Sequence, residues 1–247
     1  MTTNQDRSFL RSDRWDEWQE TETDQRQKIP SPPMQEPYPE DATLIPLPDP
    51  EDLTIGGMPV REAIAARKSH RKYTEEPLSL QELAFLLWAT QGVQRIANHR
   101  MNRTVPSAGA RHPFETYLVV NRVEGLTPGL YRYLSIEHSL CPLPAAPQLA
   151  SQVNEACREQ YVVQSAVTFI WTAIPYRTEW RYDDLSPKLI ALDAGHVCQN
   201  LYLACTAIGA GACAIGAYNQ EALDAILGLD GYNELAVYIA TTGKVAD

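Results

Sequence analysis

A run without Asp, Glu, Lys or Arg extends from residue 194 to residue 220 and constrains the fold more than any other stretch of the chain. A run of this length could cross a membrane as a helix. However, Gly209, Gly211 and Gly216 interrupt it and large aliphatic side chains are few, whereas a membrane span requires a strongly apolar sequence. We therefore predict a soluble protein in which a buried helix is followed by a glycine-rich loop.

The apolar spacing predicts both helices and strands. Apolar residues from Ile190 to Ile208 recur at the spacing of one helix face, and Gly209 can end that helix. Ser79 and Glu82 form the pattern of a capping box at the start of another helix. Shorter helices are expected at 60–67 and 220–227, and strands at 116–120, 130–134, 167–173 and 234–243. This mixture predicts an α+β domain with a central sheet.

Residues 1–55 differ from the rest because they are rich in proline and acidic residues. Proline removes backbone donors, so this segment is expected to be an extended arm or a disordered tail, and residues 56–247 to form the folded domain. The formal net charge of −10 argues against a nucleic-acid surface. Five cysteines without a C-x-x-C pair predict neither disulfides nor a metal site, which fits a cytoplasmic protein.

A cationic cluster lies between the first two predicted helices. Arg67, Ser69 and Arg71 would share one face if this segment is extended, and Lys68 lies beside them. Two guanidinium groups and a hydroxyl suit a phosphate. The alternative is that Arg67 and Lys68 only complement the dipole at the end of the preceding helix.

Two further segments contain small residues that allow a flat ligand to approach the backbone. In the first, Pro106 and Pro113 bracket a loop in which Ser107 offers a hydrogen-bond donor. The second is the glycine-rich segment 207–223, which lacks the order of a dinucleotide fingerprint. Each of them alone is a weak indication of a site.

Together these motifs resemble the nitroreductase superfamily, and within it the SagB-type dehydrogenase branch. The resemblance covers residues 48–243 and rests on R-x-S-x-R at 67–71, RTVPSAGARHP at 103–113, GLYRY at 129–133, ALDAGHVCQNLYLA at 191–204 and GAGACAIGAY at 209–218. It implies a mixed or antiparallel sheet flanked by helices, in an intertwined homodimer with FMN at the interface. It also implies an FMN-dependent oxidoreductase, for which we expect two-electron hydride transfer at flavin N5 by a ping-pong mechanism.

The resemblance assigns roles to matching positions. The phosphate and ribityl chain would contact the cluster at 67–71, a loop of the partner subunit would cover the flavin, and a later segment would pass its N5 edge. The residues concerned are Arg67, Lys68, Ser69 and Arg71 for the first, Pro106, Ser107 and Ala108 for the second, and Ala214, Ile215, Gly216 and Ala217 for the third.

Arg181 and Tyr182 correspond to a catalytic Lys-Tyr pair of azoline-oxidising relatives. Because an arginine stays protonated at neutral pH, Arg181 is expected to contact substrate rather than to accept a proton, and Arg111 or His112 could assist it. Relatives often have another phosphate-binding cation beyond the last strand. Here Lys244 could replace it, or the cluster at 67–71 could act alone.

Two functions remain open from the sequence. The first is an FMN-dependent oxidoreductase that acts on a small molecule or peptide and possibly uses NAD(P)H, with no metal, nucleic acid or membrane involved. The second is a catalytically inactive protein on the same dimeric scaffold, which binds flavin or a partner. The acidic, proline-rich arm is consistent with the second function, because such arms can recognise partners.

Overall fold

The computed structural model describes residues 6–97 and 100–246, and its centre is a seven-stranded sheet in the order β1-β6-β5-β4-β7-β9-β8. All the strand pairs of this sheet are antiparallel. The strands are β1 (Ile45–Pro46), β4 (Phe114–Val120), β5 (Gly129–Leu134), β6 (Ser139–Leu143), β7 (Val167–Ala173), β8 (Ala210–Ile215) and β9 (Leu235–Lys244). A separate hairpin joins β2 (Val93–Ala97) to β3 (Arg100–Arg103).

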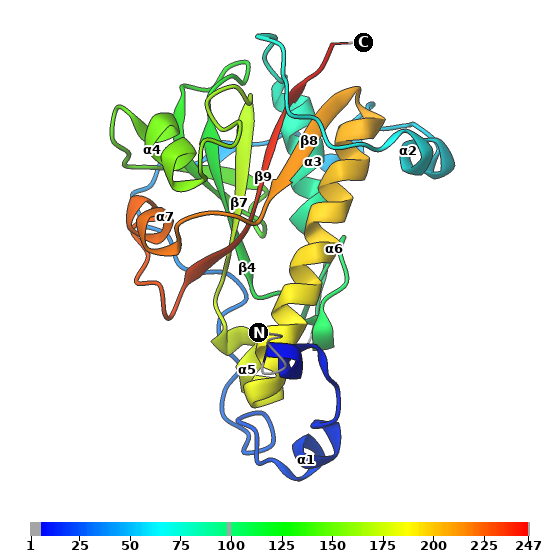
Figure 1. Ribbon diagram of the computed structural model, residues 1–247, viewed down its shortest axis with the longest axis vertical. Helices are drawn as coiled ribbons and strands as arrows, with labels where there is room; N and C mark the ends of the chain where they lie inside the picture. Colours follow the sequence, from blue (N-terminus) through cyan, green and yellow to red (C-terminus); the bar gives the residue numbers. More distant parts are fainter. Residues whose placement is uncertain (1–5, 98–99, 247) are drawn as a thin grey trace, which may run out of the picture.

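Helices cover both faces of the sheet, so the domain has three layers (Figure 1). One face packs against α3 (Leu80–Gln91) and α6 (Ser186–Ala207), and the other against α4 (Leu149–Ala156) and α7 (Gln220–Leu227). Neighbouring residues of β7 show the alternation, because Phe169 and Trp171 face α3 and α6 while Ile170 lies in the cluster of α4 and α7. The predicted α+β class with helices flanking an antiparallel sheet is therefore confirmed.

Most of the expected elements form where the pattern placed them. The Ser79–Glu82 capping box begins α3, with both reciprocal hydrogen bonds present. The short helix α2 (Val60–Ala66) and strand β7 match their predicted bounds closely, and α7 ends at Gly228 in the left-handed conformation, with φ of 74°. These predictions agree with the structure because the local sequence patterns favour the same elements that tertiary packing stabilises.

The prediction of a glycine-rich loop after the long helix was wrong. Residues 210–215 form the edge strand β8, which pairs with β9 along its whole length. A strand made largely of Ala and Gly has no alternation of polar and apolar residues, so its period could not be recognised in the sequence. The helix before it is also longer than expected, because it begins at Ser186 rather than near Ile190.

The described part of the N-terminal segment lies against the rest of the chain. It forms α1 (Trp15–Glu20), passes the helix α5 (Tyr176–Tyr182) at the lower end of the molecule in Figure 1, and adds β1 to the edge of the sheet beside β6. The division of the chain into an arm and a domain near residue 55 stays a prediction.

Three buried arginines hold the middle of this arm. Arg177 Nε donates to Pro33 O at 2.9 Å, and Arg132 Nη2 donates to Pro37 O at 2.7 Å. Arg103 Nη2 donates to the carbonyl oxygen of Met34 at 3.4 Å. The arm therefore supplies acceptors to guanidinium groups that are otherwise buried in the domain.

Candidate functional site

The cationic cluster at 67–71 runs beside the edge strand β8. Ser69 forms a parallel bridge with Ala212, and His70 N donates to Ala212 O at 2.9 Å. Gly211 permits this approach, because a Cβ at that position would lie 2.6 Å from His70 Cβ. The structure thus brings together two of the three segments singled out in the sequence.

Tyr202 on α6 joins these two segments. Its hydroxyl accepts a 2.8 Å hydrogen bond from Ala214 N and lies 3.0 Å from Ser69 Oγ. The guanidinium carbon of Arg67 lies 5.5 Å from the Tyr202 ring centroid. Arg67 and Ser69 therefore contact the same side chain, as expected from their alternate spacing. The role of Tyr202 was not foreseen, because from the sequence it is one of many residues on a long helix.

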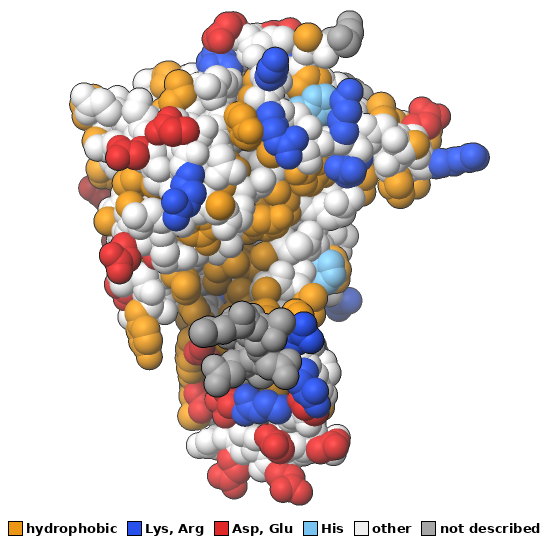
Figure 2. All heavy atoms as spheres, viewed as in Figure 1, with side chains coloured by type: hydrophobic (Ala, Val, Ile, Leu, Met, Phe, Trp, Pro, Cys, Tyr) orange, Lys and Arg blue, Asp and Glu red, His pale blue; other side chains and the backbone are white. Residues whose placement is uncertain are grey.

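The cations of this cluster are available to an anion. Within residues 6–97 and 100–246, no ion pair involves Arg67, Lys68 or Arg71. Lys68 and Arg71 are exposed, and Figure 2 shows Lys and Arg side chains gathered at this end of the molecule. Several unpaired cations beside a hydroxyl form a donor set that fits a phosphate group.

Lys244 belongs to a different interaction. Its ammonium group pairs with the carboxylate of Glu82, which also accepts from Ser79 N at 2.8 Å in the capping box of α3. Both side chains are mostly buried. The option that Lys244 binds the phosphate is therefore not supported, and the cluster at 67–71 is the cationic group that lies beside β8.

The residues after β8 leave their backbone open. Ile215 is buried as the last residue of the strand, whereas Gly216 and Ala217 are exposed. A Cβ at Gly216 would have no heavy atom within 4 Å. This space above the backbone is what a flat ligand needs if it is to lie against the segment 214–217.

The loop at 106–108 is bound to α6 through Asp193. Ser107 Oγ donates to Asp193 Oδ2 at 2.6 Å, and Ala108 N donates to Asp193 Oδ1 at 3.1 Å. Ser107 Oγ also accepts from His112 N at 2.9 Å. The hydroxyl proton of Ser107 is therefore used within the chain, so this side chain offers a ligand an acceptor and not the donor that was expected. Pro106 is exposed beside it.

Asp193 is a buried carboxylate that the sequence analysis did not single out. Burial raises its pKa, while the hydrogen bonds from Ser107 and Ala108 act in the opposite direction. These bonds satisfy the carboxylate and fix the position of the loop. Asp193 and Tyr202 are nine residues apart on α6, which corresponds to about 14 Å along the helix axis.

Arg181 and Tyr182 lie directly over the same loop. A Cβ at Gly109 would lie 2.8 Å from Arg181 Cδ and 2.7 Å from the Tyr182 hydroxyl oxygen. Gly109 has φ of +59°, a conformation that glycine adopts readily. The pair and the loop, which are about 70 residues apart in sequence, therefore form one site near the start of α6.

The arm covers this second site. Trp18 stacks on Tyr182 with ring centroids 5.7 Å apart, and its indole N–H donates to Arg181 O at 3.3 Å. Trp15 meets the same tyrosine edge-on at 6.1 Å. No sequence signal linked these tryptophans to α5, because their contact depends on the path of the whole arm.

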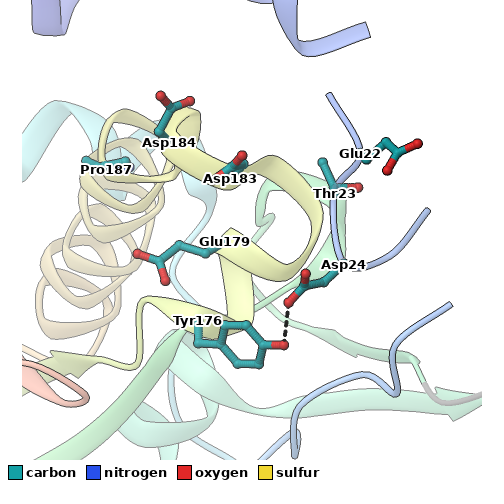
Figure 3. Close-up of a pocket in the computed structure, with 8 residues that line it drawn as sticks. All are labelled: Glu22, Thr23, Asp24, Tyr176, Glu179, Asp183, Asp184 and Pro187. Carbon is teal, nitrogen blue, oxygen red and sulfur yellow. Dashed lines mark hydrogen bonds between the residues drawn. The ribbon is translucent and has the colours of Figure 1, made fainter. Parts of the chain in front are cut away.

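An acidic pocket of about 410 Å³ lies between the arm and α5 (Figure 3). Tyr176 Oη donates to Asp24 Oδ2 at 2.7 Å across it. Burial raises the pKa of Glu179, and the nearby charge of Asp183 raises it further. The carboxylates that line the pocket come from Glu22, Asp24, Glu179, Asp183 and Asp184. Because they would repel an anion, this pocket is not suited to a phosphate.

In residues 6–97 and 100–246, no three His, Cys, Asp or Glu side chains are placed to hold a metal ion together. Over the same residues, no helix is both long and apolar enough to span a membrane.

Comparisons with known proteins agree with this architecture. Residues 64–244 match the Nitroreductase family. A Methanocaldococcus jannaschii protein that bears a nitroreductase name is 31% identical over 192 residues, covering 78% of this chain and 93% of the relative. A Ralstonia eutropha structure described as a nitroreductase has a TM-score of 0.68 and 28% identity, covering 88% of this chain and 99% of the other. The chain belongs to the Nitroreductase family, whose members are typically oxidoreductases.

Two further similarities concern a trifolitoxin-processing protein and a chain of a microcin synthetase complex. The trifolitoxin-processing protein TfxB of Rhizobium leguminosarum bv. trifolii is 29% identical over 142 residues, which are 56% of this chain and 38% of TfxB. A chain of the Escherichia coli microcin synthetase McbBCD complex has a TM-score of 0.62 at 17% identity, covering 86% of this chain and 79% of the other. At that identity the second similarity concerns the fold alone.

Proposed function

We propose that this protein is an FMN-dependent oxidoreductase of the SagB-type dehydrogenase kind. The observation that supports this most strongly is the alignment of the cationic cluster with β8, where the Tyr202 hydroxyl joins Ser69 to Ala214. This arrangement places phosphate donors beside a backbone segment that is open to a flat ring.

The donor set fits FMN in two respects. The phosphate and ribityl chain would be held by Arg67, Lys68, Ser69 and Arg71. These residues combine positive charge with a hydroxyl, and none of their cations pairs with an acid of the described residues. The backbone of Ala214, Ile215, Gly216 and Ala217 would lie along the N5 edge, since space is open above Gly216. When bound, FMN supplies two-electron hydride chemistry that no amino-acid side chain provides.

The site is proposed to be completed in a homodimer. In one chain, the Ser107 loop and the cationic cluster lie at different levels of α6, so one flavin is expected to take its loop contacts from the partner subunit. Exposed apolar side chains on α2 and α6 would be covered in such a dimer. They include Val60, Ile64 and Leu192, with exposed fractions of 68%, 60% and 54%. Pro106, Ser107 and Ala108 would then face the flavin of the other subunit.

Arg181 and Tyr182 are proposed to contact the substrate beside that flavin. Their position over Gly109 places them next to Ala108, and thus next to the ring that this loop would cover. A single shallow site favours a ping-pong order, in which the first substrate leaves before the second enters. One substrate is proposed to be a small molecule or a peptide, and NADH or NADPH could be the other.

The test is an anaerobic reduction experiment on the purified protein. Absorption bands near roughly 370 and 450 nm with FMN released by heat would establish the cofactor, and bleaching by NADH, NADPH or a candidate substrate would establish the oxidoreductase activity. A protein that binds FMN but is reduced by none of them would favour the catalytically inactive alternative. A protein that does not take up FMN would exclude the proposal.

A further inference from the structure

Among residues 6–97 and 100–246, the guanidinium group of Arg181 has no acidic partner. Its Nε is buried without a hydrogen-bond acceptor, and no carboxylate of the described residues lies within 4.0 Å of the group. It is positioned firmly nevertheless, because Cδ and Nε pack against Gly109 and Cζ lies 5.4 Å from the Tyr182 ring centroid. A positioned but unpaired cation is expected to serve a ligand.

Arg111 adds a second positive charge at the same loop. It donates from Nε to Arg177 O at 2.7 Å and from Nη2 to Ser31 Oγ at 2.9 Å, so both acceptors are neutral. Its Cζ lies 4.6 Å from the Trp180 ring centroid. Burial lowers the pKa of Arg111, and the nearby charge of Arg181 lowers it further. Two guanidinium groups thus lie near each other, and no carboxylate of the described residues pairs with either of them.

The lack of an acid to balance the charges of Arg181 and Arg111 is a local feature of this loop. The chain has an excess of acid, and the buried Arg177, only four residues from Arg181, donates to Glu115 Oε1 at 2.6 Å. The other acids of this region, Glu179 and Asp183, line the pocket of Figure 3 with Asp24. The nearby acids therefore pair with Arg177 or line the pocket. The positive charges of Arg181 and Arg111 can be balanced by a bound anion.

We propose that Arg181, with Arg111, binds a carboxylate group of the substrate. This inference rests on the proposed function and names the class of substrate. A carboxylate matches the planar guanidinium group, because the guanidinium can donate to both carboxylate oxygens at once. The carboxylate could belong to a small acid or to the terminus of a peptide.

The experiment measures binding of probe pairs to the FMN-loaded protein by calorimetry and by quenching of tryptophan fluorescence. Benzoate is compared with benzamide, and N-acetylphenylalanine with its amide. We expect the acid of at least one pair to bind about tenfold more tightly than its amide, and less tightly at high salt. The pair with the larger ratio identifies a small acid or a peptide terminus as the source. Equal binding of acid and amide in both pairs would overturn the proposal, while FMN content and reduction would still test the proposed function separately.

Variants assign the effect to the residue. Arg181→Gln should remove the preference for the acid with FMN content unchanged, and Arg181→Lys should keep part of it because the charge remains. Arg158→Gln is the matched control, since Arg158 is an exposed arginine near the end of α4 on the opposite face of the sheet. Loss of FMN from Arg181→Gln would overturn the proposal in favour of a role in cofactor binding. Unchanged acid preference in this variant would also overturn it.

Discussion

The Tyr202 hydroxyl accepts a 2.8 Å hydrogen bond from the backbone N–H of Ala214. Through its second contact, 3.0 Å from Ser69 Oγ, the same oxygen fixes the spacing between the cationic cluster and β8. Tyr202 of α6 therefore fixes the geometry of the proposed cofactor site by contacting both of its segments.

Replacing this tyrosine should weaken FMN binding with little effect on the fold. In Tyr202→Phe, Ala214 N loses its acceptor, and we expect FMN to bind about tenfold more weakly, as measured by fluorescence titration. Tyr131→Phe is the control, because Tyr131 Oη donates to Thr127 O at 2.6 Å within β5 and its turn. Equal FMN affinity in Tyr202→Phe and wild type would contradict the role of Tyr202.

Gly211 provides a steric test of the same alignment. In Gly211→Ala the new methyl would lie 2.6 Å from His70 Cβ and from Val245 Cγ1, so residues 69–71 must move away from β8. We expect a stability loss of about 1–3 kcal/mol in urea unfolding, together with weaker FMN binding. Gly129→Ala is the control, since its nearest contact would be 3.8 Å. Normal FMN affinity in Gly211→Ala would show that the cluster does not need this position.

The fold was predictable to the extent that local signals agree with packing. The capping box of α3 and the continuous apolar run of β7 are both readable from a few neighbouring residues. Strand β8 was missed because its small residues give no period, although it is held by the long partner β9. Its identity as a strand depends on pairing between residues far apart in sequence.

The site was predictable as a set of segments but not as contacts. The spacing of Arg67 and Ser69 predicted their shared face, and both side chains meet Tyr202. The anchoring of Ser107 by Asp193 depends instead on where α6 passes the loop. Contacts of this kind follow from tertiary structure, which no local pattern specifies.

The part of the arm that begins at residue 31 should be required for the stability of the folded protein. Deletion of residues 1–44 removes the arm's carbonyl acceptors from Arg132 and Arg177 and one of the acceptors of Arg103, with each lost bond costing about 1–3 kcal/mol. Deletion of residues 1–30 keeps these bonds, so its urea midpoint should lie much closer to wild type. Similar midpoints for the two truncations would contradict the anchoring role of residues 33–37.

His112 should make the protein sensitive to acid. Burial lowers its pKa to about 3, and the charges of Arg103 and Arg111 add to this effect. In the unfolded chain His112 binds a proton near pH 6.5, whereas in the folded protein it binds one only near pH 3. The free energy of unfolding therefore decreases as the pH falls through this range. His112→Asn, which tolerates the φ of +47°, should show a smaller loss between pH 6.5 and 4. The exposed His196→Asn should behave as wild type, and equal pH dependence in all three proteins would refute the assignment.

The most direct test of the central claim is the comparison of FMN and riboflavin binding to the flavin-free protein. The two ligands differ only in the phosphate that the cluster at 67–71 is proposed to hold. We expect FMN to bind more tightly by about 2 kcal/mol, or roughly thirtyfold, with the difference reduced in Arg67→Ala and in Arg71→Ala. Equal affinity for both ligands, or no binding of either, would contradict the account of this site.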